Sequence, residues 1–167
     1  MKRKTGKLFR LEQVARLGLP LGVYTIFGSG PLFVRGIKDD IGDFDLLVTQ
    51  KTWNKFKNIP GWQKKVSLKG SKYLAKGDVE LYKDWKPGRW NVKRLIRQSD
   101  VIEGLPFVKM SEVLRWKKAY NRRKDQKDIQ LILAYLNRAY AHSPSLRKDR
   151  GFDRRRSKTT TRPNRRF

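Results

Sequence analysis

The sequence predicts a mixed α/β (α+β) domain in which a small mixed sheet is flanked by helices, with further helices and a basic tail at the C-terminal end. Short segments rich in β-branched and aromatic residues alternate with segments whose apolar residues recur at helical spacing. The chain has 167 residues, of which 38% are hydrophobic, enough for the core of one compact domain. The composition changes after residue 142, so we predict a folded domain at 1–142 and a disordered tail at 143–167.

The first predicted elements are a helix and a buried strand. Apolar residues recur at helical spacing from Leu8 to Leu17, and Gly18 followed by Pro20 ends this pattern. Residues 23–27 are all β-branched or aromatic, and a glycine-containing turn follows them. This combination is typical of a strand that is buried in a sheet.

A turn, a short helix and a second strand come next. Ser29 is placed to cap a helix at 31–37, whose first residue is a proline, a residue suited to an early helical position. Residues 43–48 predict a strand in which polar and apolar positions alternate at the start. A helix with Trp53 and Phe56 on one face is expected after it.

The second half of the chain has shorter and looser elements. We expect strands near 63–68, 72–75, 78–82 and 107–110, and helices at 91–99, from Ser111 to about Tyr120, and from Asp125 to about Tyr140.

Charge is the dominant feature of the composition. Lysine and arginine number 41 against 15 aspartates and glutamates, which gives a formal net charge of +26. An excess of this size favours a polyanionic partner, and nucleic acid is the commonest one. The alternative is a basic surface that only aids solubility.

The remaining composition excludes several classes of protein. No apolar run approaches the roughly 20 residues of a membrane helix. We expect no secretory signal and no membrane association, and the absence of cysteine rules out disulfides and thiolate metal sites. A cytoplasmic protein is compatible with these observations.

The tail carries a net charge of +8 and few apolar residues, so we predict that it binds RNA without folding against the domain. Arginine suits this role because its planar guanidinium grips phosphate through two hydrogen bonds and stacks on bases. The candidate RNA-binding residues are Arg147, Arg150, Arg154, Arg155, Arg156, Arg165 and Arg166.

The turn Gly28-Ser29-Gly30 lies between the first strand and the short helix. Turns of this kind present backbone N–H groups and a hydroxyl to an anion, as phosphate-binding turns do. The alternative is an ordinary tight turn with a helix cap, which would carry no function.

The pair Asp43 and Asp45 opens the second strand. Side chains alternate across a strand, so the two carboxylates share one face while Phe44 and Leu46 share the other. Adjacent carboxylates repel each other and raise each other's pKa unless a cation lies between them. A hard divalent ion such as Mg²⁺ resolves that repulsion, although salt bridges to lysines would also do so.

A third carboxylate is predicted on the strand at 78–82. Glu80 lies opposite the apolar Val79 and Leu81, and Asp78 shares its face and competes for the same role. If this strand is next to the Asp43–Asp45 strand, three carboxylates converge and can hold two metal ions.

Two blocks of residues resemble a known family. Gly28-Ser29, a short helix and Asp43-Phe44-Asp45-Leu46-Leu47-Val48 look like the signature of the DNA polymerase β-like nucleotidyltransferase superfamily, in particular its small stand-alone bacterial and phage members of abortive-infection and toxin–antitoxin type. A second block, from Lys117 to Ile129, resembles the helix–turn–helix segment of those proteins. There Arg122, Lys124, Asp125 and Asp128 match the family pattern in register.

The resemblance implies a metal-dependent transfer of a nucleoside monophosphate from an NTP to a hydroxyl, with release of pyrophosphate. Asp43, Asp45 and Glu80 would be the catalytic and metal-binding residues, with two Mg²⁺ ions. Gly28, Ser29, Gly30 and Lys117 would bind the nucleotide. For Lys117 the alternative is a solvated lysine on a helix surface.

Two classes of function remain open at this point. The chain is either an enzyme that modifies RNA (a tRNA end above all) or a protein hydroxyl, or a catalytically silent nucleotidyltransferase-fold module that binds RNA or acts as an antitoxin-like partner. A toxin–antitoxin partner protein is compatible with both. The third carboxylate is the feature that discriminates between them.

Overall fold

The computed structural model describes residues 2–141, with side chains from residue 9 onward. The tail predicted at 143–167 and its candidate RNA-binding arginines lie outside the described residues. Within the described part, no helix combines the length and the apolar character needed to cross a bilayer.

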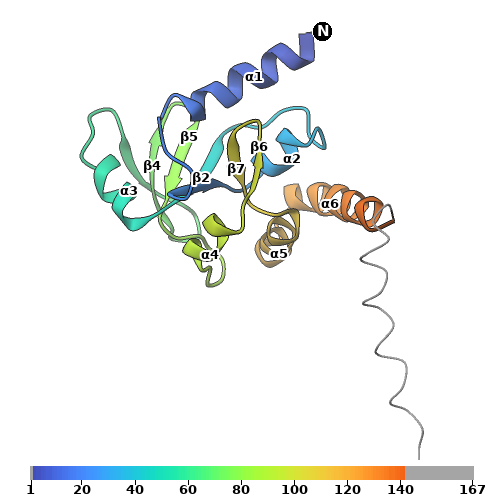
Figure 1. Cartoon of the computed structure of the whole chain (residues 1–167). Helices are drawn as coiled ribbons and strands as arrows, with labels where there is room; N and C mark the ends of the chain where they lie inside the picture. Colours follow the sequence, from blue (N-terminus) through green and yellow to red (C-terminus); the bar gives the residue numbers. More distant parts are fainter. Residues whose placement is uncertain (1, 142–167) are drawn as a thin grey trace, which may run out of the picture.

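Among residues 2–141, a mixed sheet of seven strands forms the centre of the structure (Figure 1). Its strands are β1 (Tyr24–Ile26), β2 (Phe44–Val48), β3 (Gln63–Val66), β4 (Lys72–Lys76), β5 (Val79–Tyr82), β6 (Asp100–Ile102) and β7 (Leu105–Phe107). They lie in the order β3-β4-β5-β2-β1-β7-β6. The pairs β2–β5 and β1–β7 are parallel, and the other four neighbouring pairs are antiparallel.

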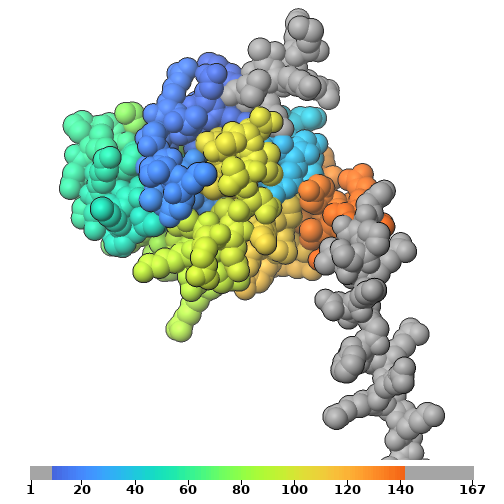
Figure 2. Space-filling view, viewed as in Figure 1, coloured from blue at the N-terminus to red at the C-terminus, as the bar shows by residue number. Residues whose placement is uncertain are grey.

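Six helices of the described part of the chain surround the sheet. They are α1 (Lys2–Ala15), α2 (Gly30–Val34), α3 (Gln50–Phe56), α4 (Val92–Arg97), α5 (Met110–Tyr120) and α6 (Arg123–Ala141). The space-filling view shows the α3 segment at one end of the molecule and α6 at the other (Figure 2). The helices α5 and α6 pack side by side (Figure 1).

Each face of the sheet has its own hydrophobic core, and β2 contributes to both. Phe44, Leu46 and Val48 belong to the first core, with residues of α1 and α3. Leu47 belongs to the second core, with residues of α4, α5 and α6. Asp45 lies on the face of Leu47, because side chains alternate along the strand. The strand therefore presents its carboxylate beside an aromatic and aliphatic core.

The structure confirms the mixed α/β class and the prediction that three strands are neighbours in the sheet. The strands predicted at 23–27, 43–48 and 78–82 correspond to β1, β2 and β5, which are neighbours in the sheet. Their apolar faces specify this arrangement, since each strand is almost entirely buried.

Three local predictions are wrong. The strand expected at 107–110 lies earlier, as the second strand of a hairpin whose two-residue turn, Glu103-Gly104, has positive φ at both positions. The helix expected to be capped by Ser111 begins at Met110, with Lys109 at the capping position. Ser29 occupies the position before α2, but its side chain makes no capping hydrogen bond.

Candidate active site

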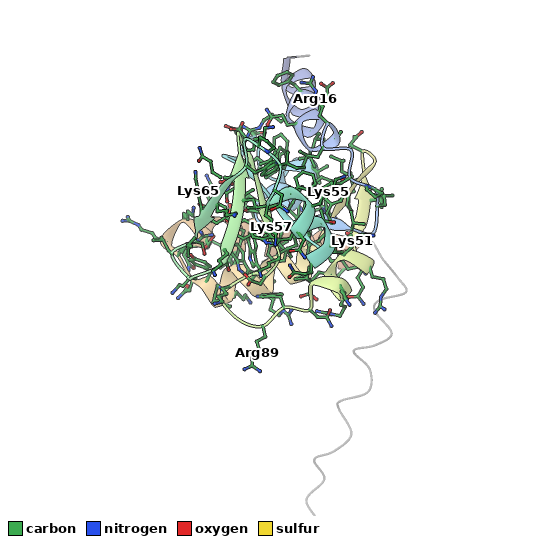
Figure 3. The ribbon with its side chains drawn as sticks, turned by 90° about the vertical axis from the view of Figure 1, so that its left-hand side faces the viewer. Arg16, Lys51, Lys55, Lys57, Lys65 and Arg89 are labelled. Carbon is green, nitrogen blue, oxygen red and sulfur yellow. The ribbon has the colours of Figure 1, made fainter. Side chains whose placement is uncertain are left out.

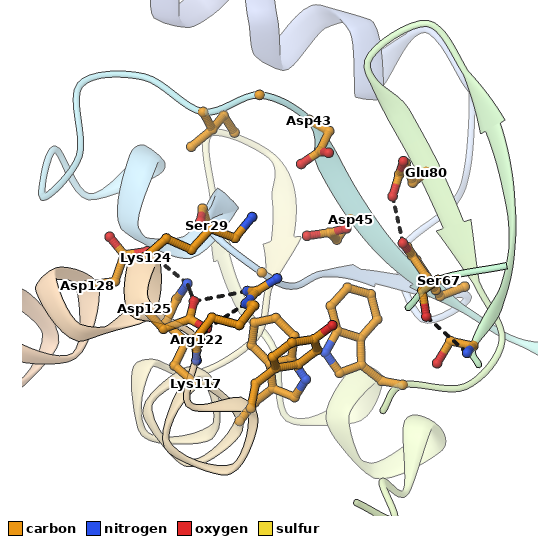
Figure 4. A pocket seen from close by; sticks show the side chains of 18 of the residues that line it. Ser29, Asp43, Asp45, Ser67, Glu80, Lys117, Arg122, Lys124, Asp125 and Asp128 are labelled. Carbon is orange, nitrogen blue, oxygen red and sulfur yellow. Dashed lines mark hydrogen bonds and ion pairs between the residues drawn. The ribbon is translucent and has the colours of Figure 1, made fainter. Parts of the chain in front are cut away.

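A cavity of about 430 Å³ opens on the face of the sheet that carries Asp45. Six of the predicted site residues line it, and these are Gly28, Ser29, Asp43, Asp45, Glu80 and Lys117. In the close-up, the carboxylates of β2 and β5 lie on one side of the cavity, and charged residues of α5 and α6 lie on the other (Figure 4). The fold thus brings residues from both sequence blocks to one place.

Gly28 and Asp45 are packed against each other. The backbone of Gly28 has φ +63°, a left-handed conformation that favours glycine. A Cβ atom at this position would collide with Oδ2 of Asp45. The glycine is therefore required both by the shape of the turn and by the position of the carboxylate.

Replacing Gly28 by alanine is expected to destabilise the protein and displace Asp45. Left-handed backbone costs an alanine about 1–2 kcal/mol, and the clash adds to this. Gly36→Ala is the matched control, because Gly36 has φ +67° and a Cβ atom there would meet nothing within 4 Å. Denaturant unfolding should show a larger loss of stability for Gly28→Ala, and equal losses would contradict the close packing of the turn on Asp45.

The turn after β1 offers unsatisfied donors to the cavity. Within the described residues, the N–H groups of Gly28 and Ser29 donate no backbone hydrogen bond, and the Ser29 hydroxyl has no capping partner. Gly30 does not line the cavity. Its N–H donates to the Phe27 carbonyl at 3.2 Å, and its Cα faces the side chain of Ile26. The turn can therefore bind an anion through its first two residues, whereas Gly30 serves close packing.

The carboxylates of Asp45 and Glu80 lie on adjacent parallel strands in direct register. Burial raises the pKa of Asp45 well above its ordinary value, and the charges of Asp43 and Glu80 raise it further. Its side chain makes no hydrogen bond or ion pair with another described residue. Burial also raises the pKa of Glu80, whose carboxylate accepts a hydrogen bond from the Tyr82 hydroxyl at 2.6 Å.

The donor set fits a hard divalent cation. Asp45 is half-buried and has no partner among the described residues, and the exposed carboxylate of Asp43 lies next to it. Together they supply the oxygen ligands that Mg²⁺ prefers. Among the described residues, no group of three or more histidine, aspartate or glutamate side chains is arranged to hold a metal ion. Asp43 and Asp45 therefore suit an ion that completes its coordination with ligand oxygens, and the binding of two ions stays a prediction.

The raised pKa of Asp45 predicts how the stability of the metal-free protein depends on pH. The folded state binds this proton more tightly than the unfolded state, so the charged carboxylate costs stability above its raised pKa. The cost disappears as pH falls through that pKa toward the ordinary carboxyl range. Asp45→Asn should therefore melt at a higher temperature than wild type at about pH 8, and the difference should shrink toward about pH 4. A difference that is independent of pH would contradict the burial of this charge.

The opposite wall contains a buried network of charges. Nζ of Lys117, whose side chain is 2% exposed, lies 3.3 Å from Asp125 and 2.8 Å from Asp128. The predicted nucleotide-binding lysine is thus bound to two carboxylates and is not a solvated surface residue. The guanidinium of Arg122 donates two hydrogen bonds to Asp125, at 2.6 and 2.9 Å, and Lys38 pairs with Asp128 at 3.1 Å.

The network lowers the pKa of Asp125. Burial alone would raise the pKa of Asp125, but hydrogen bonds from Arg122 and the charge of Lys117 lower it. Arg122 also lies over the ring of Tyr120, 4.1 Å from its centroid, and both residues line the cavity. The guanidinium is therefore held from two sides at the cavity wall.

Several lining residues were not predicted as site residues. Trp85, Trp116 and Tyr120 form an aromatic wall, and Lys38 and Lys124 add two cations. Lys124 is exposed and makes no ion pair with a described residue. Arg122 and Lys124 belong to the second sequence block, so the family resemblance indicated them. The aromatic residues could not be distinguished from ordinary core residues by their spacing.

Asp78 is separate from the cavity. It lies in the turn before β5, is exposed, and approaches Arg10 of α1 at 3.8 Å. Glu80 lines the cavity and Asp78 does not, so the geometry favours Glu80 as the third carboxylate.

Comparison with protein-family models finds no matching family, and comparisons with curated proteins and with solved structures find no significant match. The function is therefore inferred from the site. Its features are a turn with free donors, two adjacent carboxylates, and a wall of cations and aromatic rings around one cavity.

Proposed function

We propose that this protein is a metal-dependent nucleotidyltransferase with a DNA polymerase β-like fold. The observation that supports this most strongly is the contact between the Gly28–Ser29 turn and the Asp45 carboxylate inside one cavity. An anion-binding turn beside a cation-binding carboxylate pair fits a ligand that carries phosphates and a divalent ion together. An NTP with Mg²⁺ is such a ligand.

In this proposal the two sides of the cavity have different roles. The N–H groups of Gly28 and Ser29 and the Ser29 hydroxyl bind phosphate oxygens. Arg122 and Lys124 neutralise charge on the triphosphate from the facing wall. Lys117 acts indirectly, since its ion pairs with Asp125 and Asp128 hold the wall in place.

Asp43 and Asp45 would hold the metal ion, which when bound neutralises phosphate charge and lowers the pKa of a nearby hydroxyl. The acceptor oxygen forms a bond to the α-phosphorus, the bond from that phosphorus to the β-phosphate oxygen breaks, and pyrophosphate leaves. The hydroxyl proton passes to solvent or to a neighbouring carboxylate. The aromatic wall narrows the space open to water around the reacting phosphate.

The direct test is incubation of the full chain with each of the four α-³²P-labelled NTPs, Mg²⁺ and total RNA or total protein. We expect label to move onto RNA, and the reaction to stop when EDTA removes the metal. Label on a protein hydroxyl would support the same transfer reaction, with protein in place of RNA as the acceptor. Absence of transfer from every NTP to both acceptor pools would contradict the proposal.

One observation favours a second candidate function. The Glu80 carboxylate accepts a hydrogen bond from the Tyr82 hydroxyl. No group of three carboxylates in the described part of the chain is arranged to hold a metal ion. A catalytically silent module that binds nucleotide or RNA needs no third carboxylate. It would bind an NTP in equilibrium dialysis and transfer no label.

A further inference from the structure

The segment 46–77 contains eight lysines and no aspartate or glutamate. It comprises the end of β2, then α3, β3 and β4. All eight lysines are exposed, and none forms an ion pair with a described residue. They are Lys51, Lys55, Lys57, Lys64, Lys65, Lys69, Lys72 and Lys76. We call this surface the lysine edge, because β3 is the edge strand of the sheet.

The lysine edge extends around the end of the sheet (Figure 3). In this view Lys51, Lys55 and Lys57 lie on and around α3, and Lys65 lies on the opposite side of the edge strand. Strand register places Lys65 on the face of the carboxylates. Lys65 pairs with Tyr73, Tyr73 with Tyr82, and Tyr82 shares the face of Glu80. The charge of Lys65 also lowers the pKa of Glu80, against the larger effect of burial.

The lysine edge also reaches the rim of the cavity. Nζ of Lys69, in the loop between β3 and β4, lies 5.7 Å from the ring centroid of Tyr120. Ser67 and Ser71 of the same loop line the cavity. Exposed lysines therefore occur on α3, on the edge strand and at the rim of the cavity that holds Asp43 and Asp45.

An aromatic surface lies along this path. Tyr73 is half-buried and is stacked on Tyr82, with ring centroids 4.9 Å apart and an interplanar angle of 17°. Its position lies between Lys65 and the strand of Glu80. Lysines with an interleaved aromatic ring are the arrangement by which proteins bind single-stranded nucleic acid, through phosphate contacts and base stacking.

We propose that the lysine edge binds single-stranded RNA and guides its end into the cavity. The part of this proposal in which the RNA end reaches the carboxylates rests on the proposed function. The part in which the lysine edge binds RNA does not. The absence of any carboxylate over this segment leaves the lysines free to contact phosphates.

The test compares two triple variants of the full chain that lose the same charge. The edge variant is Lys64→Gln, Lys65→Gln and Lys69→Gln. The control variant is Lys93→Gln, Lys109→Gln and Lys118→Gln. All three lysines are exposed; Lys93 lies on α4, Lys118 lies on α5, and Lys109 is the residue before α5. Affinity for a fluorescent single-stranded RNA is measured at several salt concentrations. Both variants keep residues 143–167 unchanged, so any RNA binding by the predicted tail is the same in both.

We expect the edge variant to bind this RNA about tenfold or more weakly than the control variant. The slope of log affinity against log salt concentration should also be smaller by about 2, because each lost phosphate contact on a single strand removes about 0.7. Tyr73→Leu should weaken binding about fivefold or more by removing a stacking surface. Equal affinities and slopes for the two triple variants would overturn the proposal.

Vesicles of phosphatidylserine and phosphatidylcholine are the second probe. If the edge variant loses vesicle binding and keeps RNA binding, the surface faces a membrane and the proposal is wrong. No NTP is present in these measurements, so their outcome is independent of the label-transfer test. RNA binding through the lysine edge together with absent label transfer would leave this inference intact and contradict only the proposed chemistry.

Discussion

Asp43→Asn and Asp45→Asn are each expected to abolish nucleotide transfer and to leave the fold intact. An asparagine side chain has nearly the same shape as aspartate but carries no charge with which to hold a divalent ion. Metal assistance is worth several kcal/mol in a transition state, so the loss should be about a thousandfold or more. Asp45 has no described protein partner to lose, and its raised pKa shows that its charge is costly in the folded state.

Asp84→Asn is the matched control, since Asp84 is exposed and does not line the cavity. Label transfer should be unchanged in this variant. Glu80→Gln and Asp78→Asn form a second pair, and only the first should slow transfer. If Asp43→Asn and Asp45→Asn both transfer label at the wild-type rate, the carboxylate pair is not the metal site.

Lys117→Met is expected to cause the largest loss of stability. Methionine fills a similar volume but leaves Asp125 and Asp128 buried without their central cation. Removing one member of a buried ion pair typically costs about 3–5 kcal/mol. We expect a loss toward the lower end of this range, because Arg122 still pairs with Asp125 and Lys38 with Asp128. Urea unfolding at neutral pH measures this difference directly.

Lys118→Met serves as the control for this substitution. Lys118 is the next residue of α5, is exposed, and makes no ion pair with a described residue. Its replacement should change the free energy of unfolding by less than about 0.5 kcal/mol. Equal stabilities for the two variants would show that the buried network is not a structural element of the fold.

The parts of the site that depend on local patterns could be predicted from the sequence. Alternation along β2 placed Phe44 and Leu46 in the core and the two aspartates on the other face, because strand geometry fixes this period. The position of Glu80 followed from the same argument applied to β5. The prediction that these strands are neighbours is confirmed by their register.

Features that depend on distant contacts could not be predicted in this way. The burial of Lys117 requires α6 to fold back on α5, so that Asp125 and Asp128 surround its ammonium group. Nothing in the periodicity of α5 distinguishes this lysine from a solvated one. The hairpin before α5 was missed because its turn is Glu103-Gly104, without the asparagine or aspartate that typically marks such turns.

The edge strand β3 has a consequence for association between copies of the protein. All four of its residues are exposed, and one side of its backbone has no neighbouring strand among the described residues. Such an edge is a template on which a second chain can add a strand, and lysines on an edge prevent this by mutual repulsion. Lys64 and Lys65 therefore oppose pairing between copies at this edge as well as attracting phosphate. Any variant that neutralises them should be checked by light scattering, because a drop in charge here also opens a route to aggregation.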